Sequence, residues 1–237
     1  MTLVWAQFTS SPAFALALTL GAYEIGRHLQ QQFRSSPLIN PVLIAIIIVG
    51  CSLGAIGISY EQYFDGARLI HILLGPATVA LAIPLYAHIE HVRRSTLAIL
   101  VAVCIGAATG AMSAIGLAWL FGAPDVIVKS LAAKSVTTPI AMALSEQFGG
   151  LPDLTAVLVI ATGIFGAIVA APLLDLIRIE CWRARGIATG VAAHGIGTAQ
   201  ILSISELGGA FSGLGLGLCG LATAALMPFI NWLLWHR

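Results

Sequence analysis

One hexapeptide inside an apolar segment carries the side chains best suited to chemistry: Lys134 begins the sequence Lys-Ser-Val-Thr-Thr-Pro. Proline lacks a backbone N–H and clashes with the carbonyl four residues earlier, which here belongs to Ser135. We therefore expect a helix that starts at Asp125 to break near Ser135. The next helix should take Thr138 as N-cap and Pro139 as its first residue. A helix N-terminus beside a lysine presents free N–H groups and positive charge, which suits an anion.

A second stretch of this kind surrounds His194, within residues 190–200. Gly195 and Gly197 unwind a helix readily, and Thr198 is placed to cap the restart. An imidazole titrates near neutral pH, so His194 could carry a proton during a transport cycle. The alternative is a core histidine satisfied by an ordinary hydrogen bond.

Two further positions combine polar side chains with proline. Gly75, Pro76, Thr78 and Pro84 lie in one apolar segment, which predicts an irregular or kinked helix. Such interruptions point to binding sites in transporters, although a kink can also serve helix packing alone. Asn40 lies between two prolines, where it either caps the following helix or faces a cavity.

The composition is that of an integral membrane protein. The chain has 59% hydrophobic and 9% charged residues, and its mean hydropathy is +0.97, whereas soluble domains carry about 25% charged residues. Its 237 residues leave room for about six to eight spans of roughly 20 residues each, so we expect a single membrane domain over residues 1–237. A net charge of +1 gives no reason to expect nucleic acid. The cysteines lack metal-site spacing, and no HExxH, GxSxG or paired-carboxylate motif occurs, so neither cofactor nor enzymatic activity is expected.

The predicted fold is an all-α polytopic membrane protein with about six full transmembrane helices and two broken or re-entrant elements. The broken elements are residues 125–146 and 190–206. The expected spans are Phe8–Ile25, 37–60, Leu69–Ala87, Ser95–Phe121, Leu154–Leu174 and Phe211–Trp235.

Basic residues concentrate in three loops, Arg27–Arg34, His88–Arg94 and Arg178–Arg185, and the positive-inside rule places all three in the cytoplasm. The last two loops are separated by two long spans and the Lys134 segment. An odd number of crossings would break the rule, so we expect the Lys134 segment to be a hairpin that enters and leaves on the outer face. If the His194 element is also a hairpin, it enters from the inside and the C-terminus lies outside.

A short repeat is compatible with two-fold construction. The sequence Ala-Thr-Gly at 108–110, with Ala-Ile at 114–115, recurs at 161–163 and 167–168. The copies lie in spans of opposite predicted direction, as an inverted repeat requires. The alternative is a chance match in a chain rich in alanine and glycine.

Four stretches taken together resemble a known family. They read Leu-Gly-Pro-Ala-Thr-Val-Ala-Leu from 74, Lys-Ser-Val-Thr-Thr-Pro-Ile-Ala from 134, Ala-His-Gly-Ile-Gly-Thr-Ala from 193 and Gly-Ala-Phe-Ser from 209. In this order they resemble the LrgB/CidB family, over roughly Asn40 to the C-terminus. Residues 201–206 depart from the polar or acidic run usual in that family, which bears on substrate specificity more than on fold.

The resemblance implies a bacterial inner-membrane protein. Members are described as antiholin-like or as regulators of murein hydrolase export, and they often act with a small LrgA/CidA-type membrane partner. A plant relative is the plastidial glycolate/glycerate transporter, and bacterial members have been linked to pyruvate movement.

We therefore predict a secondary transporter of small 2-hydroxy or 2-oxo monocarboxylates, such as glycolate, glycerate, lactate or pyruvate, coupled to protons. The alternative is a holin-like or antiholin-like regulator that controls lysis through assembly with itself or with an LrgA/CidA-type partner. Polar broken elements favour the transporter, because an assembly module needs only packing faces. The candidate substrate-binding residues are Lys134, Ser135, Thr137, Thr138, Pro139, His194, Gly195, Gly197, Thr198, Gly75, Pro76, Thr78 and Asn40.

Overall fold

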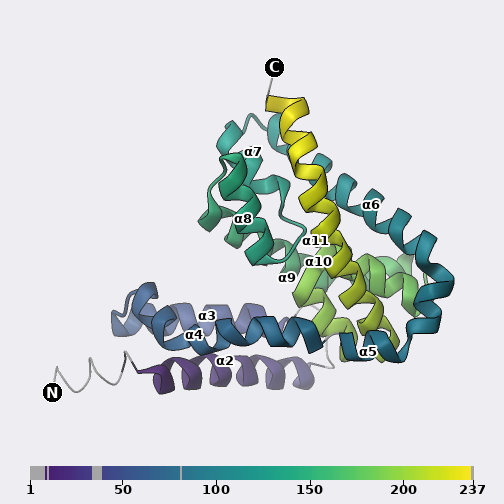
Figure 1. The fold of residues 1–237 in the computed structure, drawn as a ribbon. Helices are drawn as coiled ribbons and strands as arrows, with labels where there is room; N and C mark the ends of the chain where they lie inside the picture. Colours follow the sequence, from purple (N-terminus) through teal and green to yellow (C-terminus); the bar gives the residue numbers. More distant parts are fainter. Residues whose placement is uncertain (1–8, 10, 34–38, 81, 236–237) are drawn as a thin grey trace. The chain divides into compact units, whose positions relative to one another are not determined.

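A computed structural model describes residue 9 and residues 11–33, 39–80 and 82–235, and every regular element in this part of the chain is a helix (Figure 1). The helices are α2 (Pro12–Gln32), α3 (Pro41–Ile56), α4 (Tyr60–Ala80), α5 (Ala82–Ala87), α6 (Ile89–Leu120), α7 (Asp125–Ala132), α8 (Thr138–Phe148), α9 (Pro152–Leu176), α10 (Trp182–Leu202) and α11 (Glu206–Trp235). The chain forms two compact units, Met1–Ala80 and Leu81–Arg237. The single membrane domain expected from the composition stays a prediction.

The first unit packs α2 against both α3 and α4. Asn40 is the N-cap of α3, since its Oδ1 accepts hydrogen bonds from the backbone N–H groups of Val42 at 2.9 Å and Leu43 at 3.2 Å. Of the two roles expected for Asn40, the structure therefore shows the capping role.

The interruption expected at Gly75 and Pro76 does not end a helix. The predicted span was Leu69–Ala87, but α4 begins at Tyr60 and continues through Pro76 to Ala80, and Ala82–Ala87 form the separate helix α5. A proline inside a helix removes one backbone hydrogen bond, which a long helix tolerates. The burial of Gly75 and the side chain of Thr78 lie outside the described part of the structure.

The second unit contains three helices long and apolar enough to cross a membrane, namely α6, α9 and α11. They correspond to the predicted spans Ser95–Phe121, Leu154–Leu174 and Phe211–Trp235. Both α6 and α11 begin earlier than the apolar pattern does, because each helix extends through polar residues at its N-terminus.

Arginines mark one end of the second unit, which we call the basic end. Arg183 Nη1 donates to Ser95 Oγ near the start of α6 at 3.3 Å. Arg185 Nη1 donates to Asp175 Oδ1 near the end of α9 at 2.6 Å. The start of α6, the end of α9 and the start of α10 therefore lie together.

Tryptophans mark the opposite end, which we call the aromatic end. The rings of Trp119, near the end of α6, and Trp235, at the end of α11, have centroids 5.9 Å apart. Lys129 Nζ of α7 lies 5.2 Å from the centroid of the Trp235 ring. Thus α6 and α11 run from the basic end to the aromatic end, and α9 runs the other way.

The core of this unit lies where α6, α7, α8 and α10 meet α11. Its largest fully buried side chains include Phe211, Ile115 and Met227. Figure 1 shows α7 and α8 beside the C-terminal half of α11.

Candidate functional site at the tips of two hairpins

The helix break predicted at Lys134 is present, but it lies one residue from the predicted register. Helix α7 starts at Asp125, as predicted, and ends at Ala132. Helix α8 starts at Thr138, and its N-cap is Thr137, whose carbonyl accepts a hydrogen bond from Ala141 N–H at 2.9 Å. The prediction that Thr138 is the cap is therefore wrong. A proline is also tolerated at the second helical position, because N–H groups in the first turn have no helical partner.

Helices α7 and α8 form a hairpin whose two ends lie together. The turn between α8 and α9 meets α7 at Ser130, whose Oγ accepts from Leu151 N–H at 2.8 Å. Thr155 Oγ1 donates to Ser130 O at 3.1 Å and contacts Ser145 Oγ at 2.7 Å. Gly149 lies against Lys129 at the aromatic end. The hairpin therefore starts and finishes at the aromatic end, as a re-entrant segment requires.

Helix α10 is a second hairpin. At His194 the backbone leaves helical geometry, with φ 39° and ψ −130°. A straight helix would separate Trp182 from Ile201 by roughly 29 Å at 1.5 Å per residue. In the structure both side chains lie 3.2 Å or less from one point, the position of a Cβ added to Gly208. The chain therefore folds back at His194, and both arms of α10 lie toward the basic end.

The break lies at the histidine itself rather than at the neighbouring glycines. Gly195 is exposed, and Gly197 in the second arm packs against Ala193 and Thr189 of the first arm. A positive φ is unfavourable for a residue with a Cβ, so surrounding contacts must hold His194 in place.

Two hydrogen bonds hold the His194 tip. Its Nε2 lies 2.9 Å from Val159 O, and because a carbonyl only accepts, Nε2 carries the proton. Thr198 Oγ1 donates to His194 O at 2.7 Å and lies 2.8 Å from Ser212 Oγ. Thr198 therefore stabilises the tip through a carbonyl and does not cap the restart, contrary to the prediction.

The two hairpin tips meet in the middle of the unit, beside α11. Cys219 Sγ lies 3.8 Å from Ser135 O in the first tip and 3.9 Å from Val191 O near the second. Lys134 directly precedes Ser135 in the first tip, and His194 is the break point of the second tip. Ser135 and His194 are buried, whereas Lys134 is half-buried.

Each tip packs against a glycine of a long helix. A Cβ added to Gly110 of α6 would lie 2.9 Å from Ser135 Oγ, and one added to Gly163 of α9 would lie 2.8 Å from His194 Nε2. Gly110 and Gly163 occupy the same position in the repeated Ala-Thr-Gly sequence. The repeat noted in the sequence thus has a structural counterpart, in which equivalent glycines receive the two tips.

The structure brings some of the predicted site residues together within the second unit. Lys134, Ser135, His194 and Thr198 surround the meeting tips, while Thr137 and Thr138 are half-buried at the start of α8 and Pro139 is exposed. Asn40 and Pro76 belong to the first unit.

Sequence reasoning missed three contributors to the tip region. Ser212 contacts Thr198 and ends the Gly-Ala-Phe-Ser motif that starts at residue 209, so its hydroxyl within an apolar helix could have indicated a role. Cys219, whose spacing gave no sign of a metal site, contacts both tips through its thiol. Val159 contributes only its carbonyl, which leaves no mark in the sequence. Within the described residues, no three His, Cys, Asp or Glu side chains gather as a metal ion would require.

Helices of membrane-spanning length, together with two helical hairpins between them, define a multi-pass helical membrane protein. The chain belongs to the LrgB-like family, whose model matches residues 19–233. The family match thus starts earlier than the Asn40 boundary expected from the motifs.

Relatives match along nearly the whole chain. "Uncharacterized protein YxaC" of Bacillus subtilis is 34% identical over 92% of this chain and 94% of its own length. An "Uncharacterized protein" of Haemophilus influenzae is 31% identical over 90% and 92%. "Antiholin-like protein LrgB" of Bacillus cereus is 28% identical over 93% and 96%. No solved structure matches the chain.

Proposed function

We propose that this protein is a secondary transporter of small 2-hydroxy or 2-oxo monocarboxylates, in the class of glycolate, glycerate, lactate and pyruvate. The observation that carries the proposal is the meeting of two broken-helix tips at Cys219, one bearing Lys134 and the other His194. In the described part of the chain the Lys134 ammonium has neither an ion pair nor a hydrogen bond. A half-buried cation without a protein partner is suited to an anionic ligand.

The carboxylate would be held by Lys134 and the first turn of α8. No side chain caps that helix, so its first N–H groups and its positive dipole end are left for a ligand. The second oxygen of the substrate would be bound by Ser135, Thr137 or Thr138. Thr198, also among the candidate substrate-binding residues, is less suited to this role, because its hydroxyl proton is donated to His194 O.

His194 is proposed to carry the coupling proton. Its Nε2–H is held by Val159 O, so a transported proton would bind at Nδ1. Protonation there would place a second cation near Lys134 and strengthen the attraction for a carboxylate. Substrate and proton would then favour each other's binding, as symport requires.

In the membrane we propose six full spans, α2, α3, α4, α6, α9 and α11, with the two hairpins re-entering from opposite faces. The basic end would face the cytoplasm of a bacterial inner membrane, following the positive-inside rule. The α7–α8 hairpin would enter from outside and α10 from inside. Helices α6 and α9, each followed by its hairpin, would then form an inverted repeat with the site between them.

A second candidate function is supported by the names of relatives: Bacillus cereus proteins 28% identical to this chain are named antiholin-like. In that function the protein would regulate murein hydrolase export and lysis, acting with a small LrgA/CidA-type membrane partner or as a homo-oligomer. The hairpin tips would then be structural.

Uptake of labelled glycolate, lactate and pyruvate into liposomes that contain only this protein separates the two functions. The transporter proposal expects saturable uptake that an inward proton gradient accelerates and an excess of unlabelled substrate inhibits. Protein-free liposomes provide the control. Absence of uptake with all three acids, in either orientation of the gradient, would overturn the proposal.

A further inference from the structure

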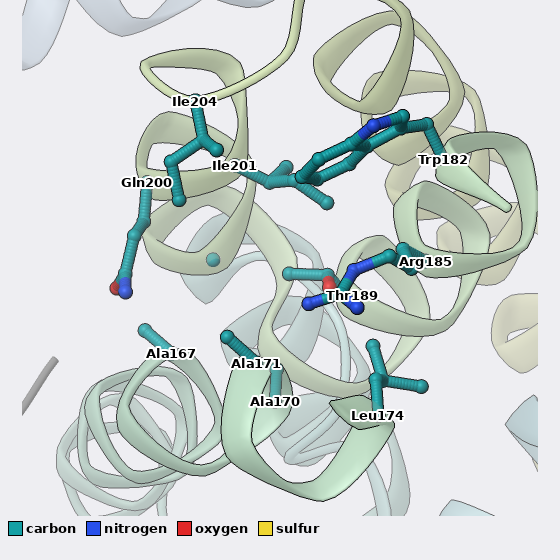
Figure 2. A pocket seen from close by; sticks show the side chains of 11 residues that line it. Ala167, Ala170, Ala171, Leu174, Trp182, Arg185, Thr189, Gln200, Ile201 and Ile204 are labelled. Carbon is teal, nitrogen blue, oxygen red and sulfur yellow. The ribbon is translucent and has the colours of Figure 1, made fainter. Parts of the chain in front are cut away.

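A second anion-binding feature lies at the basic end, away from the hairpin tips. A cavity of about 90 Å³ lies between α9 and the two arms of α10 (Figure 2). Alanines of α9, including Ala170 and Ala171, form one wall, and the first arm of α10 contributes Trp182, Arg185 and Thr189. One water needs roughly 10–15 Å³ of such space, so the cavity has room for an acid of two or three carbons.

Arg185 is the cation of this cavity, and its side chain is only 12% exposed. Its Nη1 donates to Asp175 Oδ1 at 2.6 Å and to Ile179 O at 3.0 Å. Its guanidinium carbon lies 5.1 Å from the centroid of the Trp182 ring. These contacts hold the guanidinium in one orientation, which Figure 2 shows beside Thr189 and above the alanine wall.

The guanidinium retains donors for a ligand. Arginine has five N–H donors, and among the described residues both hydrogen bonds to Arg185 use Nη1. Nε and Nη2 form the other edge of the guanidinium fork, which matches a carboxylate in bidentate geometry. Asp175 is a weak competitor for this charge, because its side chain is 66% exposed and already solvated.

The cavity also leads toward the tips. Gly197 lines it, and the next residue, Thr198, donates to His194 O at 2.7 Å. A small acid in the cavity would therefore lie one helical turn from the second hairpin tip.

We propose that this cavity is a second carboxylate site, in which Arg185 binds the carboxylate and the α9 alanines contact the carbon chain. It rests on the proposed function for its substrate class, small 2-hydroxy or 2-oxo monocarboxylates. Substrate binds at this site on its way between the basic end and the hairpin tips.

The test uses equilibrium binding of labelled lactate to the purified full-length protein, together with uptake into liposomes. Arg185→Gln should raise the concentration of lactate that half-saturates the second site about tenfold or more. Arg183→Gln is the matched control, because it removes the same charge two residues away and lines a different cavity. It should change the value less than about twofold.

A second variant avoids the ion pair altogether. Ala171→Leu fills the cavity and should reproduce the loss, whereas Ala161→Leu, at an exposed position of the same helix, should not. Monodisperse elution of each variant shows that it folds. If Arg185→Gln or Ala171→Leu folds and leaves both binding and uptake unchanged, the second site is refuted.

The same measurements separate this inference from the proposed function. In a Lys134→Met background, lactate binding that remains and is then removed by Arg185→Gln supports the second site even if no variant transports. Wild-type uptake, with both uptake and lactate binding unchanged by Arg185→Gln, retains the transporter and refutes the second site. A wild-type protein that neither binds nor transports lactate, glycolate or pyruvate overturns both.

Discussion

Gly163 of α9 lies directly against the imidazole of His194, so that a Cβ at residue 163 would lie 2.8 Å from Nε2 and closer still to Cε1. The same imidazole nitrogen donates to Val159 O, one turn earlier on α9. The second hairpin tip therefore packs directly against the backbone of α9, and only a glycine at residue 163 leaves room for the His194 ring.

This close contact between Gly163 and the His194 ring predicts the effect of Gly163→Ala. The added methyl should displace the His194 ring and break its hydrogen bond, which costs about 1–3 kcal/mol when a buried polar group loses its partner. We expect a lower unfolding temperature in detergent and impaired uptake. Gly116→Ala, on α6 with nothing within 4 Å of its new Cβ, is the control. Equal stability of the two variants would show that the His194 ring does not require a glycine at residue 163.

Cysteine labelling tests the first hairpin. Phe121 and Leu151 flank it and are 84% and 47% exposed, so Phe121→Cys and Leu151→Cys should be tolerated. The flanking glycines are less suitable, because Gly122 has a positive φ of 71° and a Cβ at Gly150 would collide with Ser145. In a Cys181→Ser background, an impermeant maleimide should label both positions from the outer face. Labelling from opposite faces would make the segment a full span.

His194→Gln tests proton coupling. Glutamine retains an N–H donor for Val159 O but cannot take up a proton. Exchange of internal for external lactate should persist, and acceleration of uptake by a pH gradient should be lost. His91→Gln, at the start of α6, controls for the removal of a histidine elsewhere. Unchanged acceleration would leave His194 with a structural role.

Lys134→Met tests the cation at the first tip. An unpaired cation in the membrane costs about 3 kcal/mol on insertion scales, so the variant should be as stable as the wild type or more stable. Carboxylate affinity should fall, and Lys134→Arg should retain part of it. Thr138→Val should leave helix stability unchanged, because no side-chain cap bond is present. A Lys134→Met protein with unaltered affinity for all three acids would rule out this site.

Cys181 offers a test of the basic end. Its thiol is exposed at the N-terminus of α10, where a backbone hydrogen bond from Ala184, and to a smaller extent Arg183, lowers its pKa. A lowered pKa keeps the thiolate populated at lower pH. Alkylation by iodoacetamide should therefore reach half its maximal rate at a lower pH than with an ordinary thiol. Loss of alkylation in Cys181→Ser would show which cysteine reacts. A half-maximal rate at the same pH as an ordinary thiol, or at a higher pH, would contradict the lowered pKa of Cys181.

The sequence by itself determined the class of protein and the places where its helices break. Composition is a property of the whole chain, so 59% hydrophobic residues and few charges already indicate a membrane protein. Proline and glycine act on the backbone within a few residues, which explains why the start of α8 could be predicted to within one residue and the end of α7 to within three. The same residue type does not always end a helix, since Pro76, where an irregular or kinked helix was predicted, lies inside α4.

Only the tertiary structure decided what the breaks are for. Three features of the second tip depend on contacts with helices distant in sequence. They are the positive φ at His194, the space left by Gly163 and the hydrogen bond to the carbonyl of Val159. The same holds for the cavity at Arg185, whose walls come from α9 and from both arms of α10. Contacts of this kind are made by backbone atoms and by the space that small residues leave open. A pattern of side-chain types cannot specify them until the chain is folded.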